Sequence, residues 1–92
     1  MSLTYPLRPR AEAVPDYGEL VSYIVRQMVS DPESVTVDVE QDGHRAVVRV
    51  GTAAADLGKV IGRNGRHIDA IRMVVRAASL RDRDRVQVEV RD

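Results

Sequence analysis

The feature that most constrains the fold of this 92-residue chain is a strand–turn–strand pattern over residues 35–50. Valine alternates with polar residues before Asp42-Gly43 and recurs after it, and this dipeptide is a strong two-residue hairpin signal because both turn positions favour positive φ. Such a turn pairs Gln41 with His44. The resulting register predicts three apolar pairs on one face and an opposite-charge pair on the other: Val39 with Ala46, Val37 with Val48, Val35 with Val50, and Glu40 with Arg45.

Two amphipathic helices flank this hairpin in the sequence, because apolar residues recur there at helical spacing. The first is predicted over about residues 16–29, with Asp16 and Glu19 forming a capping box and Pro32 preventing its continuation. The second begins after Gly65. Its predicted apolar stripe comprises Ile68, Ile71, Val74, Val75 and Ala78.

A short helix and a final strand complete the predicted elements. Thr52 is a suitable N-cap for a short helix through Asp56, and Gly62 ends that helix in the usual C-terminal manner. Val86, Val88 and Val90 alternate with polar residues and predict the last strand. The order helix, strand, strand, helix, helix, strand (α-β-β-α-α-β) predicts an α+β fold, in which a three-stranded sheet packs against three helices.

Composition limits the remaining possibilities. The chain has no cysteine, which removes disulfides and thiolate metal sites, and no cofactor or metal site is predicted. No apolar run is long enough to span a membrane, and the N-terminus lacks a signal-peptide pattern, so we expect a cytoplasmic protein. Residues 1–15 contain three prolines and predict a flexible tail before a single domain over residues 16–92.

The net charge is zero, yet the charges are segregated along the chain. Residues 31–42 carry five acidic side chains and no basic one, whereas residues 58–76 carry five basic side chains against Asp69 alone. Two interpretations remain open at this point. The two segments could pair with each other or be solvated, or the basic segment could meet a polyanion.

The basic segment contains the most informative motif, Gly62-Arg63-Asn64-Gly65, placed between two predicted helices. Glycines at both ends leave the main chain bare and permit backbone angles that other residues resist. The helix that follows directs its N-terminal amides toward the loop, and Lys59, Arg63 and Arg66 add cationic donors suited to phosphate oxygens. Backbone, dipole and charge therefore converge on an anion site.

Apolar side chains beside the loop suggest a place for nucleobases. Val60 and Ile61 are predicted to border a groove, where aliphatic packing and hydrogen bonds would replace the aromatic stacking used by other RNA-binding folds. No catalytic residue is predicted. The predicted RNA-binding set comprises Lys59, Val60, Ile61, Gly62, Arg63, Asn64, Gly65, Arg66 and Arg72.

The sequence Val-Ile-Gly-Arg-Asn-Gly-Arg over residues 60–66 resembles the Ile-Gly-x-x-Gly signature of KH domains, and the order of elements resembles the type II arrangement. The opening helix, Asp-Leu-Gly-Lys-Val-Ile-Gly over 56–62 and Ala-Ile-Arg-x-Val-Val-Arg-Ala-Ala over 70–78 are similar to the bacterial KhpA (YlqC-like) family. The likeness covers about residues 17–91. Arg63-Asn64 stands where many relatives have a basic residue followed by Gln or a small residue.

This resemblance implies single-stranded RNA binding in the bacterial cytoplasm, with a role as a small RNA chaperone or post-transcriptional regulator. It also implies self-association as a homodimer and pairing with a second KH protein of the Jag (KhpB) type. The spacing of residues in this chain indicates none of these partners by itself.

Two other classes of function remain as alternatives. A helix-turn-helix would place Arg66, His67, Asp69 and Arg72 in the major groove of DNA, although the nearby strands and the loop glycines disfavour it. A protein-interaction module would use Val60 and Ile61 as a dimer face. An enzyme is not predicted, because His44 and His67 are expected to face solvent and six residues separate Gly51 from Gly58-Lys59, too many for a phosphate-binding P-loop.

Overall fold

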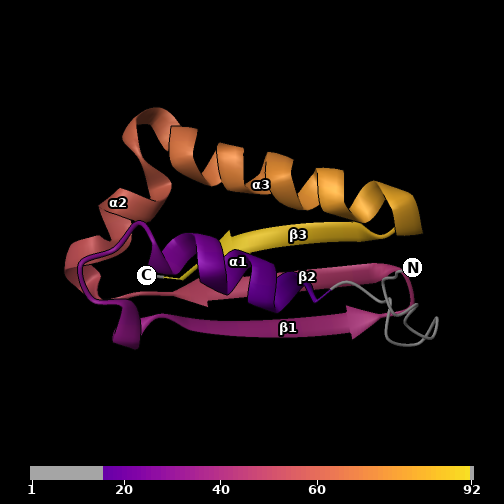
Figure 1. Cartoon of the computed structure of the whole chain (residues 1–92), viewed down its shortest axis with the longest axis horizontal. Coiled ribbons are helices and arrows are strands. Elements are labelled where there is room, and N and C mark those ends of the chain that lie inside the picture. Colours follow the sequence, from indigo (N-terminus) through magenta and orange to yellow (C-terminus); the bar gives the residue numbers. More distant parts are fainter. Residues whose placement is uncertain (1–15, 92) are drawn as a thin grey trace, which may run out of the picture.

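The computed structural model describes residues 16–91; the predicted tail, residues 1–15, lies outside the described residues. Three α-helices and three strands follow one another in the predicted order (Figure 1). Short 3-10 turns accompany them. The elements are α1 (Tyr17–Arg26), β1 (Thr36–Asp42), β2 (Arg45–Gly51), α2 (Leu57–Ile61), α3 (Arg66–Ser79) and β3 (Arg85–Val90).

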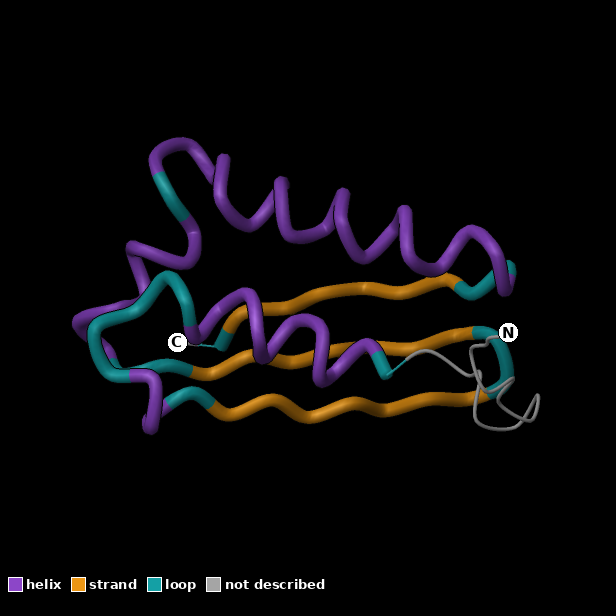
Figure 2. Tube along the Cα trace, in the orientation of Figure 1, coloured by secondary structure: helices purple, strands orange, loops and turns teal. Residues whose placement is uncertain are grey.

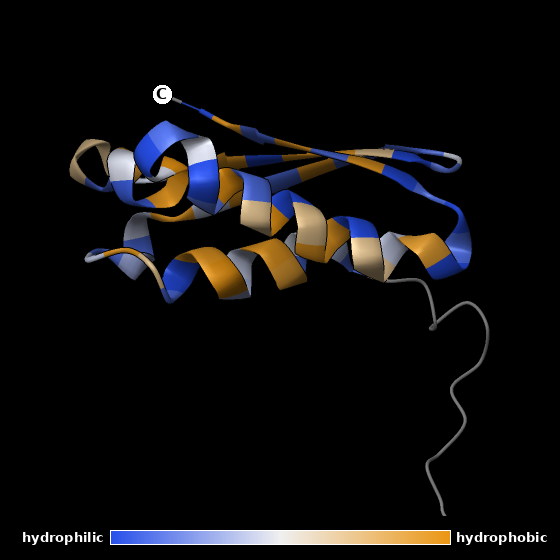
Figure 3. Cartoon of the chain, turned by 90° about the horizontal axis from the view of Figure 1, so that it is seen from above, coloured by the Kyte–Doolittle hydropathy of each residue, from blue (hydrophilic) through white to orange (hydrophobic). Residues whose placement is uncertain are grey.

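The sheet has the order β1-β2-β3, with β1 antiparallel and β3 parallel to β2. The two long helices, α1 and α3, pack against the same side of the sheet (Figure 3), and α2 contacts α3. Helix α1 covers β1 and β2, whereas α3 runs beside β3 (Figure 1). This arrangement confirms the predicted α+β fold of two layers.

Small β-branched residues dominate the core between the layers. Valines from all three helices and all three strands meet there, which fits a chain without Phe or Trp. Tyr17 is the exception, since its whole ring is buried at the start of α1. The buried apolar residues are Tyr17, Val21, Val25, Val35, Ala46, Val48, Val50, Val60, Ile68, Ile71, Val75 and Val88.

The hairpin is confirmed, but its predicted register is wrong by two residues. Gly43 and His44 form the loop, and Asp42 pairs with Arg45. Gly43 has a φ of 61° at the first loop position, and of the two loop residues it alone has positive φ. A shift of two residues keeps every side chain on its face, so alternation could not distinguish the two registers. The observed apolar pairs are Val39 with Val48 and Val37 with Val50.

The shifted register also changes the charge pairing. Glu40 lies opposite Val47, and its carboxylate pairs with the guanidinium of Arg49 at 3.1 Å, so the predicted pair between Glu40 and Arg45 is wrong. Glu40 and Arg49 lie on the face of the sheet that carries no helix. Arg45 has no such partner among the residues described.

Three helix details differ from the predictions. Helix α1 ends at Arg26, three residues early, because the N–H groups of Gln27 and Met28 turn back to Ile24 and Val25. The hydroxyl of Thr52 donates to the carbonyl of its neighbour Ala53 at 2.9 Å and caps no helix. In α3 the buried stripe is Ile68, Ile71, Val75 and Ser79, whereas Val74 and Ala78 are exposed.

Candidate nucleic-acid interface

The loop between α2 and α3 has a backbone that suits its glycines. Gly62 ends α2 with a φ of 78°, and Gly65 opens α3 with a φ of 75° in the left-handed region. Asn64 also has a positive φ of 59°, which Asn tolerates better than most residues. The N–H of Gly65 donates to the carbonyl of Gly62 at 3.1 Å and closes the turn. Figure 2 shows the short non-helical stretch that separates the two helices.

His67 braces this loop from the side of α3. Its Nδ1 lies 2.7 Å from the carbonyl oxygen of Lys59, so Nδ1–H donates and links the start of α3 to the end of α2. A Cβ on Gly62 would lie 2.6 Å from the ring carbon Cγ of His67. Gly62 is therefore required by this packing as well as by its φ. His67 is exposed, as the sequence analysis expected, but this hydrogen bond was not predicted.

The polar side chains of the loop remain available to bind a ligand. Arg63, Asn64 and Arg66 are exposed, and within residues 16–91 no carboxylate forms an ion pair with either arginine. Gly65 is the N-cap of α3 and offers no side-chain oxygen to the first-turn amides. The N–H of Arg66 donates to the carbonyl of Arg63, and no described side chain caps the first turn of α3. Positive side chains and the positive end of the helix dipole thus meet at one helix end, which favours an anion there.

The side chain of Lys59 points away from the loop and contacts Asp56 and Ser30. Its ammonium lies 3.2 Å from Asp56 and also bonds to the hydroxyl of Ser30. The Asp56 carboxylate is buried, accepts from the backbone N–H groups of Ser30 and Asp31 at 3.1 Å, and has a pKa below its ordinary value mainly because of the first of these bonds. Lys59 therefore helps to hold the segment after α1 against α2.

The two predicted apolar contacts of the groove have different environments. Val60 is completely buried, so it cannot border a nucleobase, and the structure corrects its role to core packing beneath the loop. A single turn of helix such as α2 is too short for periodicity to assign its faces. Ile61 is only partly buried and keeps some exposed surface at the end of α2.

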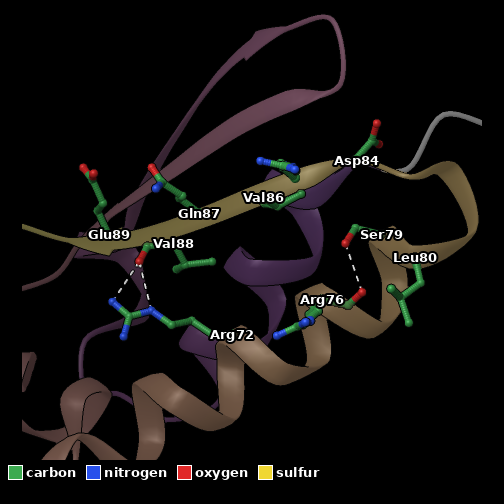
Figure 4. A pocket seen from close by; sticks show the side chains of 10 residues that line it. Arg72, Arg76, Ser79, Leu80, Asp84, Val86, Gln87, Val88 and Glu89 are labelled. Carbon is green, nitrogen blue, oxygen red and sulfur yellow. Dashed lines mark hydrogen bonds between the residues drawn. The ribbon is translucent and has the colours of Figure 1, made fainter.

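A groove of 680 Å³ runs between α3 and β3 (Figure 4). Arg72 crosses it: Nε and Nη2 lie 3.3 and 3.1 Å from the carbonyl oxygen of Val88, and Nη1 lies 3.3 Å from Asp69. Arg72 therefore lines the groove, but its donors already have acceptors. The lining residues are Arg72, Arg76, Ser79, Leu80, Asp84, Arg85, Val86, Gln87, Val88 and Glu89.

The free edge of β3 forms one wall of this groove. The N–H of Arg85 donates to His44 and the N–H of Arg91 donates to Val50, both on the β2 side. Backbone groups alternate sides along a strand, so the N–H and C=O groups of Val86, Val88 and Val90 point away from β2. The Val88 carbonyl already accepts from Arg72. The other groups are backbone donors and acceptors of the kind that can hydrogen-bond to the edges of bases.

A second buried carboxylate fixes the other end of α3. Asp84 accepts from the hydroxyl of Tyr17, and its other oxygen lies 2.8 Å from Nδ1 of His44. These two bonds, the Tyr17 bond foremost, lower the pKa of Asp84. The pKa of Tyr17 is raised far above its usual value, mainly by burial and secondly by the hydrogen bond to Asp84. Asp84 thereby joins the start of α1, the hairpin turn and the segment before β3 beside the groove.

Within residues 16–91 no group of acidic or histidine side chains has the arrangement of a metal site. No described helix has the length and apolar character needed to cross a bilayer.

Comparison with known proteins connects this geometry to a family. A family model described as "KhpA/KhpB, KH domain" matches residues 18–90. The chain is 43% identical to the RNA-binding protein KhpA of Caldanaerobacter subterraneus subsp. tengcongensis over 74 residues, covering 79% of this chain and 97% of that protein. It is 37% identical to the RNA-binding protein KhpA of Halalkalibacterium halodurans over 73 residues, covering 79% and 96% of the two chains.

Solved structures agree at the level of the fold. Era in complex with MgGDPNP and nucleotides 1506–1542 of 16S ribosomal RNA superposes with a TM-score of 0.56 at 16% identity, covering 94% of this chain and 34% of Era. Aquifex aeolicus Era bound to GDP.AlF4- gives the same TM-score at 14% identity, with 98% and 35% covered. The matched family model and the similar relatives together show that this chain belongs to the KhpA/KhpB family of KH domains.

Proposed function

We propose that this protein binds single-stranded RNA across the loop Gly62–Gly65 and along the groove between α3 and β3. The observation that carries the proposal is the position of Arg63 and Arg66 at the start of α3: both are exposed, neither forms an ion pair within residues 16–91, and no described side chain caps the helix there. A sugar-phosphate chain supplies the anions that such a site favours. The relatives named RNA-binding protein KhpA support the same ligand.

The groove supplies what the loop lacks, a surface for bases. Within the groove, the free edge of β3 offers a backbone donor and acceptor at Val86. Ile61 and the backbone of Val90 lie outside the lining of the groove and would add an aliphatic contact at the end of α2 and a further edge contact on β3. Single-stranded RNA exposes its base edges, whereas a regular RNA duplex buries them. Arg72 spans the middle of the groove and fixes the separation of α3 from β3, so we assign it a positioning role rather than a phosphate contact.

The helix-turn-helix alternative has less support. Helix α2 has only five residues, and His67 turns its ring toward the carbonyl of Lys59 instead of outward for a DNA groove. The loop also contacts a ligand best through its main chain, since both its glycines are bare. A competition between single-stranded RNA and duplex DNA for the protein separates the two proposals.

A second copy of the chain is a further proposed partner, and a KhpB-type protein another. Leu80, just after α3, and the outer face of α3 expose apolar side chains away from the loop: Met73 is 71% exposed, Leu80 68% and Val74 46%. A module that clamps about four nucleotides binds weakly, so pairing two modules raises the overall affinity. We propose that such pairs serve in the cytoplasm as small RNA chaperones or post-transcriptional regulators.

The double substitution Arg63→Asp with Asn64→Asp tests the RNA site. It replaces one cation and adds two anions where phosphates are proposed, while both side chains are exposed. We expect the affinity for a fluorescent oligouridylate to fall at least tenfold, about 1.4 kcal/mol, in an anisotropy titration. The melting temperature should barely change. An unaltered affinity would remove the loop from the RNA site.

A further inference from the structure

The face of the sheet that carries no helix has balanced charges over only part of its length. Arg49 lies 3.1 Å from Glu40 and 3.4 Å from Glu89, each an ion-pair contact, and Arg91 pairs with Asp38. These partners come from both neighbouring strands. Over this half of the face, every arginine has a carboxylate.

The half nearer the hairpin turn is different. Arg45 of β2 and Arg85 of β3 are direct partners in the parallel ladder, so their Cα atoms are about 4.8 Å apart and their side chains share one face. Like charges in this position repel each other. Among residues 16–91 neither forms an ion pair, although Asp42 is the register partner of Arg45 on β1. Asp84, the carboxylate next to Arg85, is already held by Tyr17 and His44.

A third arginine stands at the corner where the chain enters β3. Arg83 is exposed and has a φ of 59°, in the left-handed region where Gly or Asn is usual. The hydrogen bond from its N–H to the carbonyl of Leu80 at 3.2 Å closes this turn. Because a strained backbone position is a starting point for a hypothesis of function, the side chain of Arg83 is a candidate for ligand contact. Asp82 lies beside it, so this end of the molecule is not uniformly basic.

Of these three arginines, Arg85 lines the groove between α3 and β3, whereas Arg45, the ladder partner of Arg85, and Arg83, two residues before it, lie outside its lining. Arg85 lines the groove together with Arg72 and Arg76, at the end opposite the loop Gly62–Gly65 (Figure 4 shows Arg72 and Arg76). A strand that leaves the groove at this end therefore reaches Arg85 first and then Arg45. Guanidinium groups without carboxylate partners suit phosphate oxygens, which they bind through two parallel hydrogen bonds.

We propose that Arg45, Arg83 and Arg85 form a second phosphate-binding site for single-stranded RNA, beyond the far end of the groove. This inference rests on the proposed function of the loop Gly62–Gly65. It extends the contact beyond the roughly four nucleotides that such a loop clamps, along the edge of β3 and onto the face without helices.

The test compares two double variants of the full chain that remove the same charge from the same face: Arg45→Gln with Arg85→Gln, and Arg49→Gln with Arg91→Gln. Each is titrated with oligouridylates of about four and about twelve nucleotides, the range of known single-strand sites. We expect R45Q/R85Q to weaken binding of the longer RNA about fivefold or more and to reduce the steepness of its salt dependence by about 1.4. Binding of the shorter RNA should stay unchanged, as should both affinities of R49Q/R91Q.

Arg83→Gly provides an independent measurement. It relieves the left-handed strain, so the melting temperature should rise or stay the same while affinity for the longer RNA falls. A variant that is better folded yet binds less tightly cannot be explained by unfolding. If R83G keeps the wild-type affinity for the longer RNA, Arg83 does not belong to the site.

Four outcomes would overturn the second site alone, and a fifth would refute the proposed function. Equal weakening by both double variants would show a general charge effect, and wild-type behaviour of R45Q/R85Q would show no site. In a parallel titration with polyglutamate, loss of binding by R45Q/R85Q with unchanged RNA binding would assign the pair to an acidic protein. Failure of the wild-type protein to bind either RNA would refute the proposed function itself, whereas equal wild-type affinity for both lengths would refute only the second site.

Discussion

The two ends of helix α3 are constructed in opposite ways. At its start, the loop Gly62–Gly65 leaves Arg63 and Arg66 without ion-pair partners in the described chain, and glycine backbones set its shape. At its end, the turn into β3 is held by Asp84, whose carboxylate joins Tyr17 and His44. The start of α3 thus keeps its donors free for a ligand, whereas at its end the carboxylate of Asp84 stabilises the fold. Binding and folding should therefore respond to different substitutions.

The largest expected effect is that of Gly62→Ala, compared with Gly65→Ala. Both positions have positive φ, which costs an L-residue about 1–2 kcal/mol. A Cβ at Gly62 would also lie 2.8 Å from the backbone nitrogen of His67, whereas at Gly65 the nearest atom is 3.9 Å away. We expect chemical denaturation to show a loss of about 3 kcal/mol for Gly62→Ala and about 1 kcal/mol for Gly65→Ala. Equal losses would contradict the role of His67 as a brace.

Gly65→Ala sharpens the comparison further because it places a methyl group beside the first amides of α3 without a clash, in ordinary contact with Ile68 at 3.9 Å. The variant should lose RNA affinity out of proportion to its small loss of stability. If its affinity equals that of the wild type, phosphates do not approach the main chain there.

The next largest effect is expected from Asp84→Ala. It leaves the buried hydroxyl of Tyr17 without its acceptor, which costs about 1–3 kcal/mol, and also removes the bond to His44. Urea denaturation should show this loss while binding of the short oligouridylate persists. Asp82→Ala is the matched control, since no hydrogen bond or ion pair joins its side chain to the described residues.

Tyr17→Phe distinguishes the causes of that loss. In the double variant with Asp84→Ala, no hydroxyl is left unpaired, so the combined loss should be smaller than the sum of the single losses. Additive losses would mean that the two side chains do not act as a pair.

A smaller effect is expected from acid. The folded pKa values of Asp84 and Asp56 both lie below that of an ordinary carboxyl group, because hydrogen bonds favour their charged forms. Their contribution to stability is complete above the unfolded pKa, about 4, and is lost as the pH falls through the folded values. The melting temperature should therefore decline below about pH 4, and Asp84→Asn should flatten that decline. A decline equally steep in Asp84→Asn would contradict the assignment.

The same contrast explains what the sequence could predict. Alternating valines and the Gly-x-x-Gly motif are local patterns, and both the strands and the loop conformation follow from them. The contacts of Asp84, Asp56 and His67 were missed because they depend on packing between distant segments: Tyr17 and Asp84 are 67 residues apart. A local pattern also cannot fix the hairpin register, because a slip of two residues preserves both faces.

Helix α2 shows a further limit. Val60 was predicted at the RNA surface and is fully buried, because the single turn of α2 gives no periodicity from which to choose a face. Lys59 is equally ambiguous in sequence, since a lysine next to a candidate phosphate site is indistinguishable from one that pairs with a buried aspartate. The structure resolves the two cases through Asp56 and Ser30.

The most direct measurement of the central claim is a two-dimensional NMR titration of the 15N-labelled protein with a short oligouridylate. Bare main chain at the start of α3 should receive the phosphates, so the amide signals of Gly62 to Ile68 should move most, with those of Val86 and Val90 next. The amides of Tyr17 and β1 should stay in place. Undisturbed loop amides in the presence of saturating RNA, with shifts confined to other surfaces, would contradict the account.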